Sequence, residues 1–358
     1  MPPIRFFLPG PTFVHPEVLA AQAAQPVAHR SAAFREIYER VAQRLAVVFR
    51  SEREVILATG SGTLLMQAAV QSLVERRVLH LVCGAFSARW QEISRSLGKE
   101  ADTVAVPWGE AVAPELVRQA LRRARYDAVT LAHCETSTGV LSPLPEIAAV
   151  VREESEALLL VDAVSSLAGA AVETAEWGLD LVLTASQKAL ALPPGLAFAT
   201  LSPRAEERAE RGTRRGFYTD LRRYLQKHRE GGPISTPAVT LVYALDRQLE
   251  RLLAEGVEER WERHRRLLRR TEAWSQQRGV PFAAAAGARS PTVSALRAPA
   301  GWQAPAWVQA LARRGFTVGG GYGDWKRDTF RIGHMGEVSE ADLDGLLAAL
   351  DDVLAAGR

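Results

Sequence analysis

The hydrophobic positions of this chain fall into short apolar runs separated by longer amphipathic segments. From Ser51 onward the short runs are apolar at consecutive rather than alternate positions, which is typical of strands covered by helices on both faces. The segments between them, such as residues 61–77, carry apolar side chains at helical spacing. This alternation predicts a largely parallel α/β sheet. The predicted strands are EVILAT, VLHLVC, DTVAVP, DAVTLAH, ALLLVD, DLVLTA and LAFATL.

The pattern changes near residue 235. A long amphipathic stretch over residues 235–274 has Gly256 as its one break, and it predicts helices. Beyond it, strands near SPTVSAL, GFTVG and TFRIG and helices near PAWVQALARR and the C-terminus suggest a smaller α+β domain. A length of 358 residues also favours two domains. We therefore expect a large α/β domain over residues 17–255 and a small domain built from residues 1–16 and 256–358.

Charge and composition narrow the class of protein. The chain has 44 basic and 41 acidic residues and a net charge of +3, without a sustained basic tract that would bind a nucleic-acid backbone. Its first residues, MPPIRFFLPGPT, do not resemble a secretory signal, and no apolar stretch is long enough to span a bilayer. We expect a cytoplasmic protein that binds neither nucleic acid nor membrane.

The two cysteines do not indicate a metal site or a disulfide. Cys83 and Cys134 follow different predicted strands and neither belongs to a CxxC motif. We therefore expect no zinc site and no disulfide framework.

The first candidate site follows a predicted strand, in EVILATGSGTLL. Here a strand ends in small residues and a helix begins at about Gly62, flanked by Ser61 and Thr63. Free N–H groups at such a helix start, with two hydroxyls beside them, can bind a phosphate group. Glycines after a strand also serve ordinary tight turns. Leu65 occupies the place of the third glycine of a dinucleotide fingerprint, which counts against NAD.

The second candidate is Asp162, at the end of the apolar run ALLLVD. The carboxyl end of a parallel strand is the edge of the sheet at which ligands bind. One interpretation is an ordinary helix N-cap, which aspartate often provides. The other is a partner for a buried cation of a ligand, for which a protonated pyridine nitrogen is suitable.

The third candidate is Lys188, on the loop after the run DLVLTA. Only four lysines occur among the 44 basic residues, at positions 99, 188, 227 and 326. An amine among apolar neighbours loses pKa and becomes a nucleophile toward carbonyl groups. An exposed loop lysine is the usual alternative. The scarcity of lysine, together with Asp162 and the phosphate-loop signal, favours Schiff-base chemistry at Lys188.

Seven segments in order give the chain a specific resemblance. The sequence resembles the class V aminotransferases, pyridoxal-phosphate enzymes of fold type I, and within them the alanine–glyoxylate and serine–pyruvate branch. This resemblance implies a large domain with a mostly parallel seven-stranded sheet and a smaller α+β domain that completes the active site. The matching segments are FLPGPTFVHPEVL, TGSGT, HCETSTGVLSPL, VDAVSSLAG, ASQKALALPPG, STPAVTLVYAL and FRIGHMG.

The resemblance implies a role for each matching residue around the cofactor. Lys188 would form the Schiff base with pyridoxal 5'-phosphate and then move the substrate proton, while Asp162 would hold the proton of the pyridinium nitrogen. Ser137 would lie beside the phenolic oxygen of the ring. Phe86 stands where related enzymes commonly stack a tryptophan on it, and keeps the aromatic face without the indole donor. The phosphate would be bound by Ser61, Gly62, Thr63, Gln187 and, from the neighbouring subunit, Thr236.

The same resemblance assigns the substrate to Arg331, in TFRIGHMG, because a guanidinium binds an α-carboxylate through two parallel hydrogen bonds. We interpret His334 as a structural histidine. The expected activity is ping-pong transfer of an amino group from alanine or serine to glyoxylate or pyruvate, in at least a homodimer. Trp90 is expected to pack in the core.

Other functions would require other residues. The segment AHRSAAF resembles one that phosphoserine aminotransferases use, so His29 and Arg30 could bind a substrate phosphate, or could simply precede a helix capped by Ser31. A sulfur-transferring lyase on the same fold would need a reactive cysteine on a mobile loop. A NAD-dependent dehydrogenase leaves Lys188 unexplained. A non-catalytic binding protein on the same scaffold would not need the reactive residues, whereas in this chain every expected reactive position is occupied.

Overall fold

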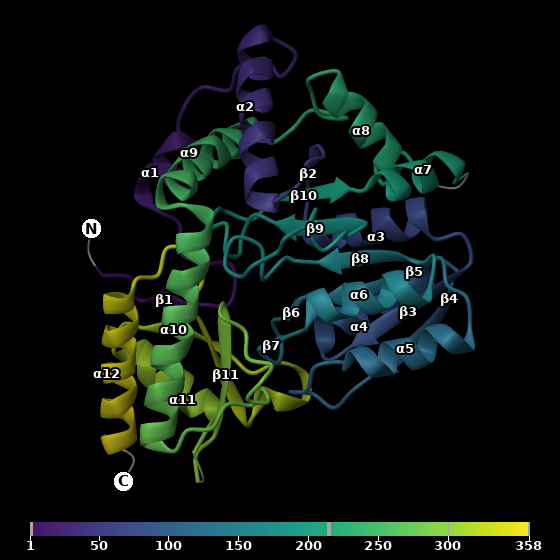
Figure 1. The fold of residues 1–358 in the computed structure, drawn as a ribbon. Helices are drawn as coiled ribbons and strands as arrows, with labels where there is room; N and C mark the ends of the chain where they lie inside the picture. Colours follow the sequence, from purple (N-terminus) through teal and green to yellow (C-terminus); the bar gives the residue numbers. More distant parts are fainter. Residues whose placement is uncertain (1–2, 213–215, 300, 357–358) are drawn as a thin grey trace.

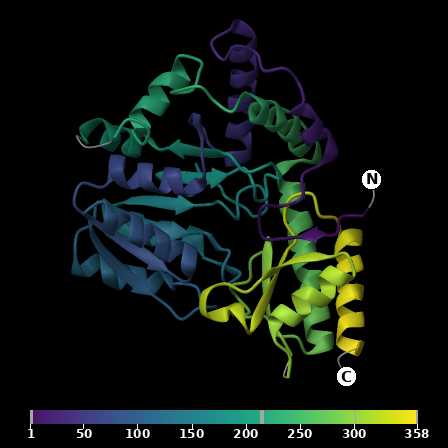
Figure 2. The same ribbon diagram turned by 180° about the vertical axis from the view of Figure 1, so that it is seen from behind.

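The computed structural model describes residues 3–212, 216–299 and 301–356. They form two units that lie side by side, one around a seven-stranded sheet and one around a four-stranded sheet (Figure 1). Both ends of the described chain lie in the smaller unit, as the view from behind also shows (Figure 2).

The large sheet has the strand order β2-β10-β9-β8-β5-β3-β4. Neighbouring strands are parallel except at β10, which runs antiparallel to both β2 and β9. Every predicted strand is present, which confirms the mostly parallel seven-stranded sheet. The strands are β2 (Val55–Thr59), β3 (Arg77–Val82), β4 (Glu100–Ala105), β5 (Ala128–Ala132), β8 (Leu158–Asp162), β9 (Leu181–Ala185) and β10 (Leu196–Leu201).

Helices cover both faces of this sheet, which explains why β5, β8 and β9 are buried at every position. In β8, Leu159 and Val161 belong to one hydrophobic core and Leu158 and Leu160 to the other. The first core is shared with α2 (Ala32–Phe49), α5 (Pro114–Arg123), α6 (Leu144–Glu154) and α9 (Val239–Glu255). The second is shared with α3 (Gly62–Leu73), α4 (Ala85–Ser96), α7 (Pro203–Arg211) and α8 (Leu221–Arg229).

The smaller unit follows a break between two long helices. Gly256, with a φ of +92° that favours glycine, separates α9 from α10 (Val257–Arg278). A third core joins α10 to a sheet of order β1-β12-β13-β11 and to two further helices. These elements are β1 (Phe6–Phe7), β11 (Val293–Arg297), β12 (Thr317–Gly320), β13 (Thr329–Gly333), α11 (Ala304–Arg313) and α12 (Glu340–Ala356).

The short strand β1 was not predicted, because two residues are too few for a periodic pattern. It pairs in parallel with β12 and so brings the start of the chain into the C-terminal unit. The division into residues 17–255 and residues 1–16 with 256–358 stays a prediction, with which this pairing and the break at Gly256 are consistent. The remaining elements are α1 (Pro16–Ala21), the hairpin strands β6 (Cys134–Glu135) and β7 (Val140–Leu141), and a 3₁₀ turn η1 (Gly323–Lys326).

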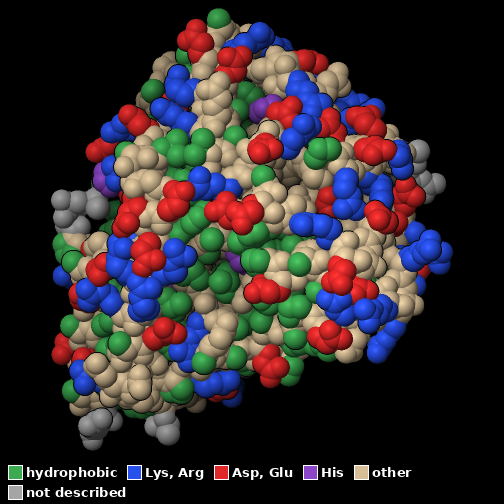
Figure 3. Space-filling model, in the orientation of Figure 1, with side chains coloured by type: hydrophobic (Ala, Val, Ile, Leu, Met, Phe, Trp, Pro, Cys, Tyr) green, Lys and Arg blue, Asp and Glu red, His purple; other side chains and the backbone are tan. Residues whose placement is uncertain are grey.

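The surface mixes both signs of charge. Positive and negative side chains are interspersed over the face seen in Figure 3. Many of them form ion pairs, such as Arg40 with Asp246 at 2.6 Å and Arg278 with Asp351 at 2.7 Å. Among the described residues, no helix is both long and apolar enough to cross a bilayer.

Candidate active site

A cavity of about 360 Å³ opens at the carboxyl ends of β8 and β9. Because these strands are parallel neighbours, Asp162 at the end of β8 and Lys188 in the loop after β9 reach the same edge of the sheet. The volume lies within the range of small-molecule sites. The sequence-predicted residues that line the cavity are Ser61, Gly62, Thr63, Phe86, Asp162, Gln187 and Lys188.

The side chain of Lys188 is closely surrounded by the N-terminal segment. Its Nζ donates a hydrogen bond to the carbonyl oxygen of Pro9, from the N-terminal segment. A Cβ on Gly10 would come within 2.5–2.6 Å of the lysine side chain, so glycine is required there. Burial, with a further contribution from the positive charge of Arg331, lowers the pKa of Lys188 to about 8. An appreciable fraction of the amine is therefore neutral, and so nucleophilic, near neutral pH.

The carboxyl group of Asp162 faces the same cavity and is buried. Within the described residues its hydrogen bond comes from the N–H of Val164, at 2.8 Å. The pKa of Asp162 is raised to about 7, mainly by burial and also by the negative charge of Glu135. The Val164 hydrogen bond and the charges of Lys188 and Arg89 act in the opposite direction. A cation bound in the cavity would restore the charged carboxylate, and a protonated ring nitrogen has that charge.

The start of α3 forms another wall. Ser61 is its N-cap residue, and within the described chain its side chain makes no capping hydrogen bond to the helix, so the hydroxyl is available to a ligand. The first N–H groups of a helix have no acceptor within the helix itself. A Cβ on Gly62 would approach Val164 to 2.8 Å, so glycine lets the helix start pack against the loop after β8. This wall suits an anion such as a phosphate.

Phe86 is the second residue of α4 and lines the cavity. The guanidinium of Arg89 lies 4.8 Å from the centre of that ring, and the ring of Tyr322 lies 5.4 Å away from it. Trp90 is buried and donates a hydrogen bond to the Met66 carbonyl at 3.1 Å. The prediction that Trp90 packs in the core is thus confirmed.

Ser137 is fully buried behind the cavity wall. Its hydroxyl donates to Glu135 at 2.6 Å and accepts from the N–H of Ala85 at 3.1 Å. Thr136, its neighbour, lines the cavity instead. A direct contact between Ser137 and the cofactor ring stays a prediction.

Arg331 reaches this region from β13 of the smaller unit. It donates to the carbonyl oxygens of Gly320 at 2.8 Å and Thr136 at 3.0 Å, and its guanidinium lies 5.6 Å from the centre of the Tyr322 ring. Burial lowers its pKa. Its hydrogen bonds within the described chain thus go to backbone carbonyls, and a carboxylate is not among these partners.

His334 is buried, bonds to Ser294 at 2.8 Å and behaves as the expected structural histidine.

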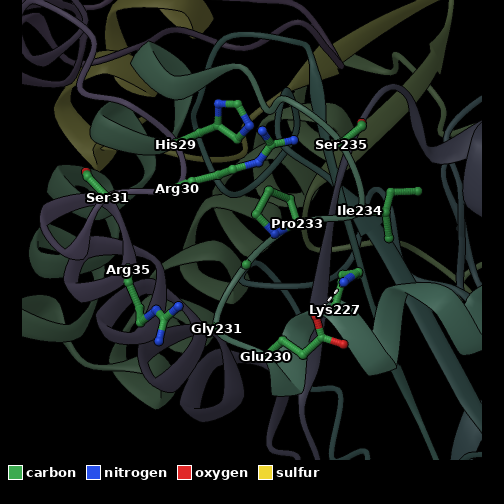
Figure 4. A pocket seen from close by; sticks show the side chains of 11 residues that line it. His29, Arg30, Ser31, Arg35, Lys227, Glu230, Gly231, Pro233, Ile234 and Ser235 are labelled. Atoms are coloured by element: carbon green, nitrogen blue, oxygen red, sulfur yellow. Dashed lines mark hydrogen bonds and ion pairs between the residues drawn. The ribbon is translucent and has the colours of Figure 1, made fainter.

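His29, Arg30 and Thr236 do not line the Lys188 cavity. His29 and Arg30 line a separate cavity of about 340 Å³, whose opposite wall includes Ser235 (Figure 4). Thr236 follows that wall and is exposed. Ser31 does cap α2, accepting the N–H of Phe34 at 3.3 Å. Within a single chain, these residues are therefore not brought together with Lys188.

The two cysteines are free and buried. Burial raises the pKa of Cys83 to about 12 and of Cys134 to about 11, so neither thiol is activated. This environment disfavours the sulfur-transferring lyase. Among the described residues, no group of three metal-binding side chains comes together.

Sequence reasoning missed several residues of the site. Arg89 is one of many arginines, and Tyr322 lies in a glycine-rich turn that carries no chemical signature. Glu135 lies between Cys134 and Ser137, two residues after the predicted strand DAVTLAH, and this place near the carboxyl end of a strand was a usable signal. Gly10 and Pro9 reach the site only through the tertiary fold.

Comparison with known proteins agrees with this geometry. The family model for aminotransferase class V matches residues 16–319. The chain belongs to this family. Its mixed sheet and its smaller C-terminal unit are those of fold type I, and the enzyme is a transaminase.

Individual relatives cover nearly the whole chain. An uncharacterised aminotransferase of Methanocaldococcus jannaschii is 38% identical over 96% of this chain and 91% of its own length. The L-aspartate–glyoxylate aminotransferase of Paracoccus denitrificans is 33% identical over 96% of this chain and 89% of its own. The crystal structure of an alanine–glyoxylate aminotransferase from Nostoc sp. superimposes with a TM-score of 0.92 and 32% identity, covering 99% of this chain and 96% of that one.

The raised pKa of Asp162 gives a prediction for the protein freed of cofactor. Between about pH 4 and 7 the folded protein binds a proton at Asp162 that the unfolded chain does not, so this group makes the free energy of unfolding fall as the pH rises. Asp162→Asn removes that dependence. At pH 8 the variant should be more stable than wild type by roughly 2–4 kcal/mol, and at pH 4 the two should be nearly equal.

Denaturant unfolding at both pH values measures this difference in the free energy of unfolding. The contributions of the other titrating groups are common to the two proteins and cancel in the difference. A variant that is less stable than wild type at pH 8 would show that Asp162 is well solvated or already paired.

Proposed function

We propose that this aminotransferase uses pyridoxal 5'-phosphate to move an amino group from a small amino acid, alanine or serine, to a 2-oxo acid, glyoxylate or pyruvate. The observation that carries the proposal is the meeting of a lysine with a lowered pKa and an aspartic acid with a raised pKa in one cavity. Groups shifted in this way mark sites of proton transfer. The relatives' names include glyoxylate as an acceptor.

The residues of the cavity fit this cofactor. Pyridoxal phosphate supplies an aldehyde that joins to amines and a pyridinium ring that accepts the electrons of a substrate carbanion. Asp162 would hold the ring-nitrogen proton, and its shortage of partners within the described residues agrees with that role. The start of α3 and the side chain of Gln187 would bind the phosphate. Phe86 would cover one face of the ring.

Lys188 would be both the attachment point and the base. With a pKa of about 8, its amine can take the α-proton of the amino donor and return it without a large energetic penalty in either direction. The second half-reaction reverses these steps with the acceptor, so the kinetics are ping-pong.

Arg331 would bind the α-carboxylate. The guanidinium is fixed by two backbone carbonyls and keeps an N–H edge for a carboxylate, and a fixed carboxylate orients the α-hydrogen toward Lys188. Because every α-amino acid has this carboxylate, Arg331 does not select among donors.

Two further points of the proposal concern assembly. Thr236 is exposed, next to the cavity of Figure 4, and would contact the phosphate bound by the neighbouring subunit. The working form is then at least a homodimer. A cytoplasmic location stays a prediction.

Lys188→Ala should reduce transamination of alanine with glyoxylate at least a thousandfold, because it removes the base and the nucleophile together. Turnover of purified enzyme, measured with added cofactor, tests this. Lys99→Ala is the control, since Lys99 lies between α4 and β4, lines neither this cavity nor the one that contains His29 and Arg30, and should leave turnover unchanged. Comparable activity of the two variants would remove Lys188 from the mechanism.

Arg331→Ala should lower kcat/KM for amino donors about a hundredfold, mostly through KM, because the bidentate hydrogen bonds to a charged group are lost. Arg331→Lys keeps the charge without the fork and should fall between wild type and the alanine variant. Steady-state kinetics with alanine measure the effect. A kcat/KM within threefold of wild type in the alanine variant would contradict the role.

Phosphoserine is the second candidate donor, for which the cavity of Figure 4 provides a specific observation. Its lining includes the cationic groups Arg30, Arg35 and Lys227, with His29 beside them. Lys227 is paired with Glu230, while the arginines face the cavity (Figure 4). In a homodimer such a cavity could bind an anionic side chain of a donor held by the neighbouring subunit.

Activity with alanine, serine and phosphoserine, measured side by side, decides between these donors. We expect higher kcat/KM with alanine or serine, and less than a threefold effect of Arg30→Ala on either. A preference for phosphoserine that Arg30→Ala abolishes would instead establish the second candidate.

A further inference from the structure

One buried carboxylate beside the active-site cavity has no part in the proposed reaction. Glu135 ends the short strand β6, is fully buried, and stands between the start of α4 and the segment that carries Thr136 and Ser137. A buried charge is costly unless its oxygens are fully paired. The hydrogen bonds of Glu135 provide this pairing.

Five donor groups converge on the two carboxylate oxygens. Oε2 accepts the N–H and the hydroxyl of Ser87, both at 2.9 Å. Oε1 accepts the N–H of Ser137 at 3.1 Å and its hydroxyl at 2.6 Å. The N–H of Phe86 lies 3.1 and 3.2 Å from the two oxygens. Because every partner donates, the surroundings match an ionised carboxylate, which only accepts.

The carboxylate replaces a missing helix cap. The N-cap residue of α4 is Gly84, which has no side chain, and the N–H groups of Phe86 and Ser87 belong to the first turn, where no intrahelical acceptor exists. A Cβ on Gly84 would meet Cγ and Cδ of Glu135 at 2.5 and 2.6 Å. Glycine is therefore needed there for Glu135 to approach the helix.

The same carboxylate also holds a second segment of the cavity wall, the one that carries Thr136. Through Ser137 it holds the segment in which Thr136 lines the cavity and offers its carbonyl oxygen to Arg331 at 3.0 Å. One buried charge thus joins the residue proposed to cover the ring, Phe86, to the segment that steadies the proposed carboxylate site.

We propose that Glu135 is a positioning residue that sets the place of Phe86 relative to the Thr136–Ser137 wall, and thereby the fit of the cofactor ring. The inference rests on the proposed function, since that function makes Phe86 and Thr136 walls of a cofactor site. Glu135 touches neither cofactor nor substrate in this account. Its effect should appear in how the cofactor is held.

Glu135→Gln is the direct test. The amide has one oxygen where the carboxylate has two, and its NH₂ group would face the N–H of Ser87 or of Ser137, so at least one hydrogen bond is lost and two donors are brought together. We expect the dissociation constant of pyridoxal phosphate, from equilibrium absorbance titration, to rise at least tenfold. The circular dichroism of the bound cofactor's absorption band should change by half or more, because it depends on the surroundings of the ring.

Two other variants test the same inference in case the Glu135→Gln protein does not fold. Ser87→Ala removes one of the five donors and does not touch the cavity lining, and it should raise the dissociation constant two- to fivefold. Gly84→Ala displaces the carboxylate without removing it and should reproduce the Glu135→Gln spectrum.

Asp180→Asn is the matched control. Asp180 is also buried and accepts the N–H of Leu159 at 2.9 Å and the hydroxyl of Ser202 at 2.7 Å, but it precedes β9, at the opposite end of the sheet. This variant should lower the Tm without changing the dissociation constant or the spectrum.

If the Glu135 and Ser87 variants bind the cofactor within twofold of wild type, with an unchanged spectrum and only a lower Tm, Glu135 is structural and the inference is wrong. A wild-type protein that binds no pyridoxal phosphate is a different result, which would overturn the proposed function itself.

Discussion

The burial of two ionisable groups of opposite kind at one edge of the sheet is the constraint on which the rest of this structure depends. Removing Lys188 and Asp162 from water disfavours their charged forms, and this moves their pKa values toward each other, to about 8 and about 7. Neither shift would persist if the side chains could turn out to solvent. The fold holds both groups in place, and a cation bound beside Asp162 would favour its charged form and so offset the cost of burying it.

That placement follows from the two hydrophobic cores. Alternate residues of β8 pack into opposite cores, so packed helices hold the strand from both faces. Its parallel pairing with β9 then fixes the loop that carries Lys188 relative to Asp162. The smaller unit adds Arg331, which is tied to the large unit through the carbonyl of Thr136. Reactive groups from distant parts of the chain therefore meet at one rigid edge.

Much of this could be predicted from local sequence patterns. Consecutive apolar positions predicted the covered strands. The scarce lysine after β9 and the aspartate at the end of β8 predicted the site, because the carboxyl end of a strand has a defined place in a parallel sheet. The pattern did not predict β1, whose two residues carry no period, or Tyr322 and Pro9, which approach the site only after the two units have packed. His29, Arg30 and Thr236 lie apart from Lys188 in one chain, so their assigned roles depend on a second chain.

Attachment of the cofactor to Lys188 can be tested by chemistry rather than by kinetics. Purified protein is incubated with pyridoxal phosphate, reduced with borohydride, digested and mapped by mass spectrometry. The account predicts one stoichiometric reduced adduct, on Lys188. An adduct on Lys99, Lys227 or Lys326 in place of Lys188, or no adduct at all, would contradict it.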